Sequence, residues 1–307
     1  MTDFPVRRVD RSARIAVETL GSKPKFWFRE GDRRFLFKAE ERGTGEDWAE
    51  VIASRLCVLL GVPHVDYALA RQYEGPRDRG PGVVCENMAP PPDALVLGNE
   101  MLLARDPHYP KLQRFKVREH TVEAVRDVIS TLAPPPDAYL AGAPAGVKSA
   151  LDVFTGYVML DAWIANQDRH HENWGVLLAG KMLYLAPTFD HGASLARNLI
   201  EKERSDRLTT HDRGRGIAQF VRRARSAFYA DATARRPLTT FEAWRAFAAR
   251  APNAESIWLA RLAAIDEPTI SGLLDEVPPH RMTRISRDFT TALLAENRRR
   301  LLANEDE

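Results

Sequence analysis

Short apolar runs separated by polar turns fill the first part of the chain. Three runs rich in Phe, Trp and Val lie within residues 14–40 and are separated by a loop at 21–24 and a turn at 30–32. This pattern predicts three β-strands. In the third, Phe35 and Phe37 fall on one face, and Leu36 and Lys38 fall on the other, because side chains alternate along a strand.

Two further apolar runs, at residues 65–70 and 83–85, lie on either side of a segment rich in Gly, Pro and Arg at 74–82. They predict two more strands with a long turn between them. The first part of the chain is therefore expected to contain five strands and one helix.

That helix is predicted between the third and fourth strands. Thr44 is the expected N-cap, Asp47 follows three positions later, and Gly61 and Pro63 mark the end. The apolar residues recur at helical spacing on one side of the segment: Trp48, Ile52, Leu56 and Leu59.

The periodicity changes after Met88 from that of strands to that of helices. A proline-rich stretch begins at Ala89, and the rest of the chain shows helical spacing interrupted by one hairpin, expected as strands 174–178 and 182–186. The predicted helices cover residues 122–132, 149–165, 220–229, 241–249, 257–265 and 289–302. The sequence thus predicts an α+β protein with a small β-rich lobe over residues 1–88 and a larger, mainly helical lobe over 89–307.

Composition narrows the class of protein. The chain has 307 residues, 44% of them hydrophobic, and a formal net charge of +2. A packed core is expected, and the near-neutral charge argues against direct nucleic-acid binding by the whole surface. No stretch reaches the ~18 apolar residues of a membrane span, and residues 1–8 lack the apolar run of a secretion signal, so a cytoplasmic protein is expected. Cys57 and Cys85 are the two cysteines and are expected to be buried thiols.

One segment of the helical lobe combines the groups that phosphoryl transfer needs. Asp168 follows a predicted helix, Asn173 comes five residues later at the start of the hairpin, and Asp190 follows the hairpin's second strand. Paired strands bring Asn173 and Asp190 together. A carboxylate and an amide oxygen are ligands that Mg²⁺ accepts, and Asp168 in an accessible loop could receive a proton from a hydroxyl group.

The β-rich lobe offers positive charge for nucleotide phosphates. The loop Gly21-Ser22-Lys23-Pro24-Lys25 could wrap a phosphate with main-chain N–H groups and lysine charge. Lys38 ends a strand, and Glu50 lies on the face of the next helix that could pair with it, as the strand lysine and helix glutamate do in kinases.

In this order, the loop, lysine, glutamate, Asp-x4-Asn and Asp-x-Gly resemble the HipA-like kinases, a bacterial serine/threonine kinase family with a divergent protein-kinase fold. The resemblance covers nearly the whole chain and implies an ATP- and magnesium-dependent enzyme with a protein substrate. It implies Asp168 as catalytic base, Asn173 and Asp190 as magnesium ligands, and Lys38 as the phosphate-binding lysine held by Glu50. The hinge that contacts adenine would comprise Glu86, Asn87 and Met88.

Two departures from the family bear on its toxin role. Full-length members carry an additional N-terminal subdomain that contacts an antitoxin, whereas this chain begins almost at the first kinase strands. A separate antitoxin-like protein therefore stays a possible partner. Some members carry a regulatory serine directly before the loop glycine, where this chain has Leu20; Ser22 and Thr19 are the nearby hydroxyls.

Other functions are compatible with parts of the pattern. Asp168-Arg169-His170-x-x-Asn173 also resembles the catalytic loop of phosphoinositide kinases, so a lipid or small-molecule kinase is an alternative. A catalytically silent kinase-like module that binds nucleotide is another. His170, His171 and His191 could suggest a metal-dependent hydrolase, but His170 is expected to support the loop beside the nucleotide.

Basic residues are dense in residues 204–236, which could contact nucleic acid or an acidic protein. The aromatic residues there recur at helical spacing, so a solvated helix face is the preferred interpretation.

Overall fold

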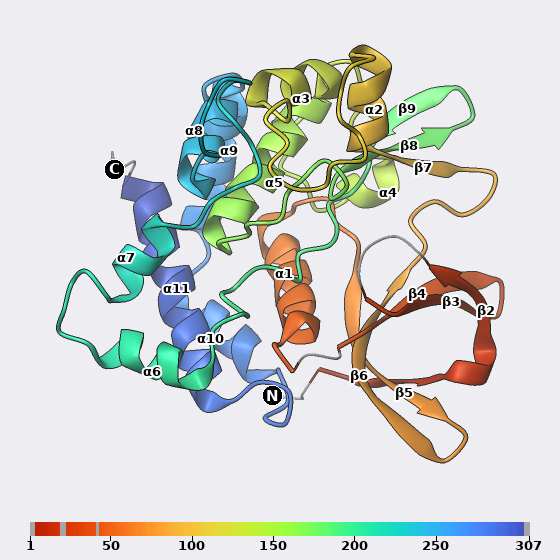
Figure 1. The fold of residues 1–307 in the computed structure, drawn as a ribbon, viewed down its shortest axis with the longest axis vertical. Helices are drawn as coiled ribbons and strands as arrows, with labels where there is room; N and C mark the ends of the chain where they lie inside the picture. Colours follow the sequence, from red (N-terminus) through yellow and green to blue (C-terminus); the bar gives the residue numbers. More distant parts are fainter. Residues whose placement is uncertain (1–3, 19–22, 41–42, 304–307) are drawn as a thin grey trace.

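A six-stranded sheet forms the N-terminal region of the protein, as described by a computed structural model (Figure 1). The structure describes residues 4–18, 23–40 and 43–303. The strand order is β1-β5-β6-β4-β3-β2, with β1 parallel to β5 and the other pairs antiparallel. The strands are β1 (Arg7–Asp10), β2 (Arg14–Glu18), β3 (Lys25–Glu30), β4 (Arg33–Ala39), β5 (Tyr67–Glu74) and β6 (Arg77–Glu86), with a short 3₁₀ turn at Arg11–Ala13.

Five of these strands match the predicted strands, and the predicted two-faced character of β4 is confirmed. Phe35 and Phe37 pack with Phe26 and Phe28 in a small aromatic cluster on one side of the sheet. Leu36 lies on the other side, in the main core that also contains the first helix. Lys38 therefore faces the helix rather than the aromatic cluster.

The predicted long turn at 74–82 is wrong, because the two strands around it continue to a tight turn between Glu74 and Arg77. Arginine–carboxylate pairs across the ladder, including Arg71 with Asp78 at 2.6 Å, fix the polar ends of these strands. Strand β1 has only four residues and was not predicted, since its sequence is polar and charged.

Helix α1 (Glu46–Leu60) begins after Gly45 and not after the predicted N-cap Thr44. Gly45 has φ 84°, and a side chain there would collide with the Trp48 indole. The carboxylate of Glu40 accepts from the main-chain N–H of Glu46 at 2.8 Å and thus does the capping. The predicted end at Gly61 is confirmed, with φ 76°.

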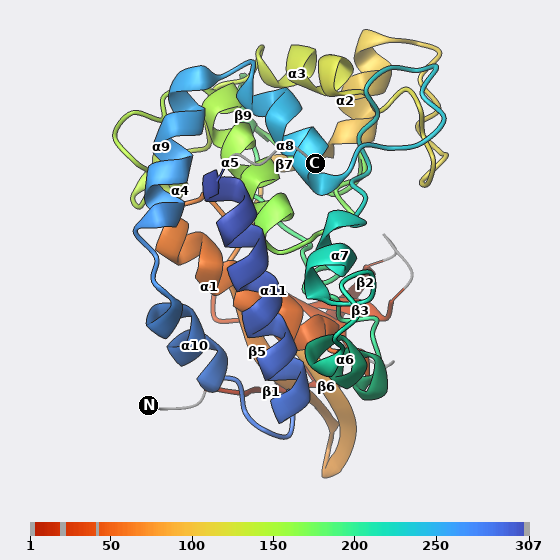
Figure 2. The ribbon, with the colours of Figure 1, turned by 90° about the vertical axis from the view of Figure 1, so that its left-hand side faces the viewer.

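The C-terminal region is mainly helical (Figure 2) and contains a second sheet of order β7-β8-β9 (Figure 1). Its strands are β7 (Ala94–Leu97), β8 (Gly175–Ala179) and β9 (Met182–Leu185). Its helices are α2 (Gly98–Arg105), α3 (Val122–Ile129), α4 (Asp137–Leu140), α5 (Ala150–Trp163), α6 (Glu201–Thr209), α7 (Ile217–Arg222), α8 (Thr240–Ala248), α9 (Pro252–Ala263), α10 (Glu267–Asp275) and α11 (Arg284–Ala303).

The predicted helix over 220–229 is wrong. Helix α7 ends at Arg222, and the main chain beyond it pairs with residues 238–240 through bonds such as Ser226 N–H to Leu238 O at 2.8 Å. Phe228 instead stacks on His120. The hairpin and the helices α3, α5, α8, α9 and α11 agree with prediction to within about five residues at each end, whereas β7, α2, α4, α6 and α10 were not predicted.

One continuous core joins α1 to the helices of the C-terminal region. In Figure 1, α1 lies between the six-stranded sheet and the other helices, and it contacts β5, β6, α9 and α10. The proposed lobe boundary after residue 88 follows the end of β6 and stays a prediction. Within the described residues, none of the helices combines the length and apolar character that crossing a bilayer requires.

Candidate active site

A buried lysine lies at the centre of the candidate site. Lys38 is on β4, and its Nζ lies 3.1 Å from Glu50 Oε1, 3.0 Å from Asp190 Oδ1 and 3.2 Å from the Tyr67 hydroxyl. Lys38 is 8% exposed and Glu50 3%. Burial alone would lower the pKa of Lys38, but the carboxylates of Asp190 and Glu50 raise this pKa well above its usual range. The ammonium group is therefore charged at any physiological pH.

Asp190 reaches this lysine from the segment after β9. Its φ of 58° lies in the left-handed region, which is uncommon for a residue with a side chain and is typical of constrained functional positions. The next residue fixes the turn, because the N–H of His191 donates to Glu50 Oε2 at 2.8 Å. Although burial would raise the pKa of Asp190, the ammonium of Lys38 holds it well below its usual range.

The loop that carries Asp168 is built on a buried ion pair. Helix α5 is capped by Ser149, at the predicted start of the helix, and supplies Asp161 near its end. Arg169 binds this carboxylate with two hydrogen bonds of 2.7 and 2.8 Å, and its Nη1 donates to the carbonyl of Asn173 at 2.8 Å. Asn166 adds a third hydrogen bond to Asp161 at 2.7 Å. The charged pair thus fixes both ends of the segment from Asp168 to Asn173.

Asp168 remains partly accessible, with a third of its side chain exposed. The amide nitrogen of Asn173 donates to the main-chain carbonyl of Asp168 at 2.6 Å. Burial, with help from the nearby Asp190 carboxylate, raises the pKa of Asp168 to about 6. A carboxylate with a pKa close to neutrality is suited to accept a proton from a hydroxyl group.

A cavity of about 460 Å³ lies between the six-stranded sheet and the catalytic loop, and we call it the nucleotide cavity. It is lined by Lys38, Asn173 and Asp190, and at its edge by the predicted hinge residues Glu86, Asn87 and Met88. In the part of the chain that the structure describes, the main-chain N–H of Met88 has no hydrogen-bond partner. That N–H is available to a heterocyclic base, and the apolar side chains of Leu36 and Phe189 could pack against the ring.

A second cavity, of about 340 Å³, meets the first at Lys38 and Asp190, and we call it the acceptor cavity. Asp168, Lys23, Lys25 and Arg197 are among its lining residues. Lys23 also pairs with Glu46, and burial lowers the pKa of Lys23 to about 8. Gly21 and Ser22, which were predicted to contact phosphate, lie outside the described residues.

The donor set fits a magnesium ion completed by phosphate and water. Asn173 uses its amide nitrogen on Asp168, which leaves its carbonyl oxygen for a ligand, and Asp190 Oδ1 accepts from Lys38. Both residues line the nucleotide cavity. One carboxylate and one amide oxygen are a common protein contribution to a nucleotide-bound magnesium site.

Each histidine of this region uses at least one ring nitrogen in a contact with the protein. The Nδ1 of His170 accepts from the N–H of Glu172 at 3.1 Å, His171 Nδ1 lies 2.8 Å from the Tyr109 hydroxyl, and His191 Nε2 lies 2.9 Å from Thr188 Oγ1. Among the described residues, no group of three His, Cys, Asp or Glu side chains is arranged to hold a metal ion.

Two residues of the site were missed by sequence reasoning. Tyr67 contacts Lys38 and the N–H of Asp190, and Arg114 lines both cavities, with its Nε 3.2 Å from His170 Nε2. The sequence pattern around Tyr67 is that of an ordinary strand. Arg114 lies in an irregular loop that is distant from the motifs in sequence, so no local pattern could identify either.

We expect the fold to lose stability as the pH falls from about 6.5 towards 3, in part because of His120. Its Nδ1–H donates to the carbonyl of Ala227 at 3.0 Å, and its Nε2 accepts from Trp174 at 3.1 Å, so the native ring is neutral. Burial lowers the pKa of His120 to about 3. The unfolded chain then binds more protons below about 6.5, which costs about 2 kcal/mol at pH 5.

The test is urea denaturation of wild type and His120→Asn between pH 7.5 and 5. Asn keeps the donor at the Nδ1 position but does not titrate. The variant should show a smaller fall in the free energy of unfolding over this range than wild type. Equal falls in both proteins would remove His120 as a source of the acid sensitivity.

No protein-family model matches the chain, and no curated protein sequence matches it either. Solved structures that share its fold include the following two. The Helicobacter pylori proinflammatory kinase CtkA is 17% identical, with a TM-score of 0.69, over 97% of this chain and 96% of that one. HipA, from the toxin–antitoxin complex of Shewanella oneidensis MR-1 with HipB and operator DNA, is 13% identical, with a TM-score of 0.59, over 95% of this chain and 68% of that one. The chain therefore has an α+β, HipA-like kinase fold, with a β-sheet N-terminal region and a helical C-terminal region.

Proposed function

We propose that this chain is an ATP- and magnesium-dependent kinase that transfers the γ-phosphate of ATP to a serine or threonine hydroxyl of a protein. The observation that carries the proposal is the meeting of two cavities at Lys38 and Asp190, with Asp168 on the acceptor side and Asn173 on the nucleotide side. The kinase fold supports the same reaction class.

Each residue would have a separate role in this reaction. Lys38, held by Glu50, would bind the nucleotide phosphates, and the hinge at Met88 would contact the base. A magnesium ion held by Asn173 and Asp190 would offset the charge of the phosphate oxygens. Asp168 would orient the acceptor hydroxyl and take its proton as the oxygen–phosphorus bond forms and the bond to ADP breaks.

The first experiment is incubation with γ-labelled ATP and magnesium, alone and with a cell extract that contains proteins and lipids. Labelled protein carrying phosphoserine or phosphothreonine would support the proposal. Labelled lipid with unlabelled protein would favour the phosphoinositide-kinase alternative. Nucleotide binding without any turnover would favour the silent module, and absence of both would overturn the kinase proposal.

Lys38→Met should lower kcat/KM for ATP roughly 10- to 100-fold, the range expected for loss of a hydrogen bond to a charged group. The matched control is Lys181→Met, because Lys181 is exposed in the β8–β9 turn and lies in neither cavity. Initial rates at varied ATP concentration measure the effect, and circular dichroism checks that the variant is folded. Unchanged kinetics would remove Lys38 from the nucleotide site.

The fold that the chain shares with HipA also supports a proposal about a protein partner. We propose that a separate antitoxin-like protein binds this chain, since the solved HipA complex contains HipB and operator DNA. Co-purification of the tagged chain from its native host, followed by mass spectrometry of bound proteins, tests this proposal. A stable stoichiometric partner would support it, and recovery of the chain alone would count against it.

A further inference from the structure

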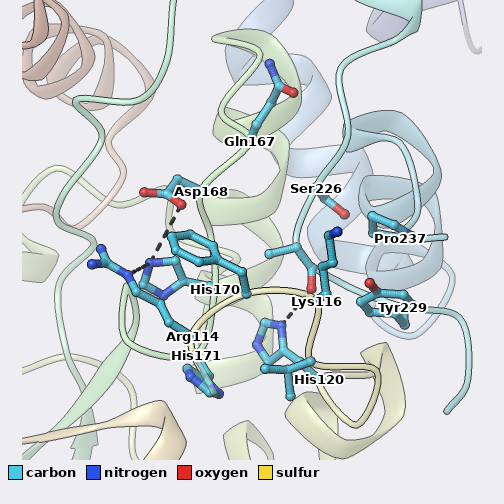
Figure 3. A pocket seen from close by; sticks show the side chains of 13 residues that line it. Arg114, Lys116, His120, Gln167, Asp168, His170, His171, Ser226, Tyr229 and Pro237 are labelled. Carbon is cyan, nitrogen blue, oxygen red and sulfur yellow. Dashed lines mark hydrogen bonds and ion pairs between the residues drawn. The ribbon is translucent and has the colours of Figure 1, made fainter. Parts of the chain in front are cut away.

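A third cavity, of about 140 Å³, adjoins Asp168, and we call it the flanking pocket (Figure 3). Three segments that are distant in sequence line it: the loop 114–117, the catalytic loop 167–171 and the segment 226–237. Asp168 belongs to this pocket as well as to the acceptor cavity, but Lys38, Asn173 and Asp190 are absent from its lining. The flanking pocket therefore lies beside the proposed base and apart from the nucleotide side of the site.

Carbon atoms make up most of the surface of the flanking pocket, although the charged side chains of Arg114, Lys116 and Asp168 also line it. Val117, Ala227, Tyr229 and Pro237 contribute carbon surface. The imidazole rings of His120, His170 and His171 also line it. A cavity of ~150 Å³ can hold a benzene molecule. The flanking pocket is thus large enough for one aromatic ring or one branched aliphatic side chain.

Phe115 stands at the mouth of this pocket in a fixed position. It is 63% exposed, yet it lines both the flanking pocket and the acceptor cavity. The amide of Gln113 donates to the carbonyls of Phe115 and Lys116 at 3.0 and 3.2 Å, and Lys116 has φ 57°. An exposed aromatic side chain on a loop that has internal hydrogen bonds and a residue in the left-handed conformation is typical of a contact site for another molecule.

We propose that the flanking pocket and Phe115 bind an apolar side chain next to the acceptor serine or threonine of a protein substrate. This inference rests on the proposed function. Successive Cα atoms are about 3.8 Å apart, so a substrate with its hydroxyl at Asp168 places a neighbouring side chain within reach of a pocket that shares Asp168. An inositol headgroup carries hydroxyls and phosphates and has no apolar group to fill the pocket, so the apolar wall favours a protein acceptor over a lipid.

The test uses a library of short peptides that each contain one acceptor serine or threonine. The residue directly before the acceptor and the residue directly after it are varied. With labelled ATP and magnesium, wild type should prefer Leu, Met or Phe at one flanking position roughly tenfold over Gly or Asp, as burial of one such side chain implies. Phe115→Ala should reduce that ratio to about one or two, because it removes the outer wall of the contact. Ala227→Phe should reduce it as well, because the new ring occupies the pocket.

Leu112→Ala is the matched control. Leu112 lies in the same loop and is 91% exposed, but it lines none of the three cavities. This variant should keep the wild-type preference. Phosphorylated peptides without any flanking preference, or a preference that neither Phe115→Ala nor Ala227→Phe alters, would overturn this inference and leave the kinase proposal standing. Failure of wild type to label any peptide or protein would overturn both.

Discussion

Asp168→Asn should reduce phosphate transfer by roughly 10²- to 10⁴-fold, the usual contribution of a general base. Asparagine has the same shape and can keep the hydrogen bond from Asp168 N–H to Asn166 Oδ1 at 3.1 Å, because a main-chain group makes it. The amide cannot accept the hydroxyl proton. The loss should therefore appear in kcat, while the KM for ATP changes little.

Steady-state kinetics at saturating substrate measure this effect, with Asp66→Asn as the control. Asp66 has 68% of its side chain exposed and lies in neither the nucleotide nor the acceptor cavity. Thermal denaturation should give similar midpoints for Asp168→Asn and wild type. A kcat within threefold of wild type would exclude Asp168 as the base and would move attention to another group in the acceptor cavity.

Arg169→Ala should lower the free energy of unfolding by about 3–5 kcal/mol, because it leaves the Asp161 carboxylate buried without its partner. The two side chains are 1% and 4% exposed. The same change removes the hydrogen bond that holds the carbonyl of Asn173, so phosphate transfer should fall together with stability.

Two further variants test whether the fall in the free energy of unfolding comes from the unpaired charge of Asp161. Asp161→Leu combined with Arg169→Met removes both charges and should recover most of the lost stability. It should not recover phosphate transfer, because the hydrogen bond to the carbonyl of Asn173 is still missing. Lys202→Ala breaks an exposed pair with Asp206 and should cost at most about 1 kcal/mol. Urea denaturation measures all three. A loss for Arg169→Ala no larger than that for Lys202→Ala would contradict the role assigned to the pair.

The sequence predicted those features that depend on neighbours along the chain. The alternation in β4 placed Lys38 on the face of α1, and the paired strands β8 and β9 brought Asn173 and Asp190 to one cavity. Features that depend on distant contacts were missed or wrong. The segment 220–229 has helical spacing, yet Phe228 packs on His120, and this distant contact overrides local propensity.

The start of α1 shows the same limit at a smaller scale. Thr44 is a good N-cap by composition, but its hydroxyl accepts from Arg197, a residue more than 150 positions away. The carboxylate of Glu40 and the left-handed Gly45 set the start of the helix instead. The place of Arg114 in the site could not be predicted for a related reason, because its loop reaches the cavities only in the folded chain.

The packing of α1 has a consequence for control of the proposed kinase activity. The helix carries Glu50 towards Lys38, and one turn earlier it carries Asp47, whose carboxylate meets Arg281 at 2.7 Å with both side chains at most 4% exposed. Tilting α1 away from Lys38 would break this second buried pair, at a cost of several kcal/mol. Lys38, early in the sequence, and Arg281, late in the sequence, therefore both hold α1 in the position that pairs Glu50 with Lys38. In the proposed kinase, inactivation is therefore expected to act by blocking access to the cavities and not by moving this helix.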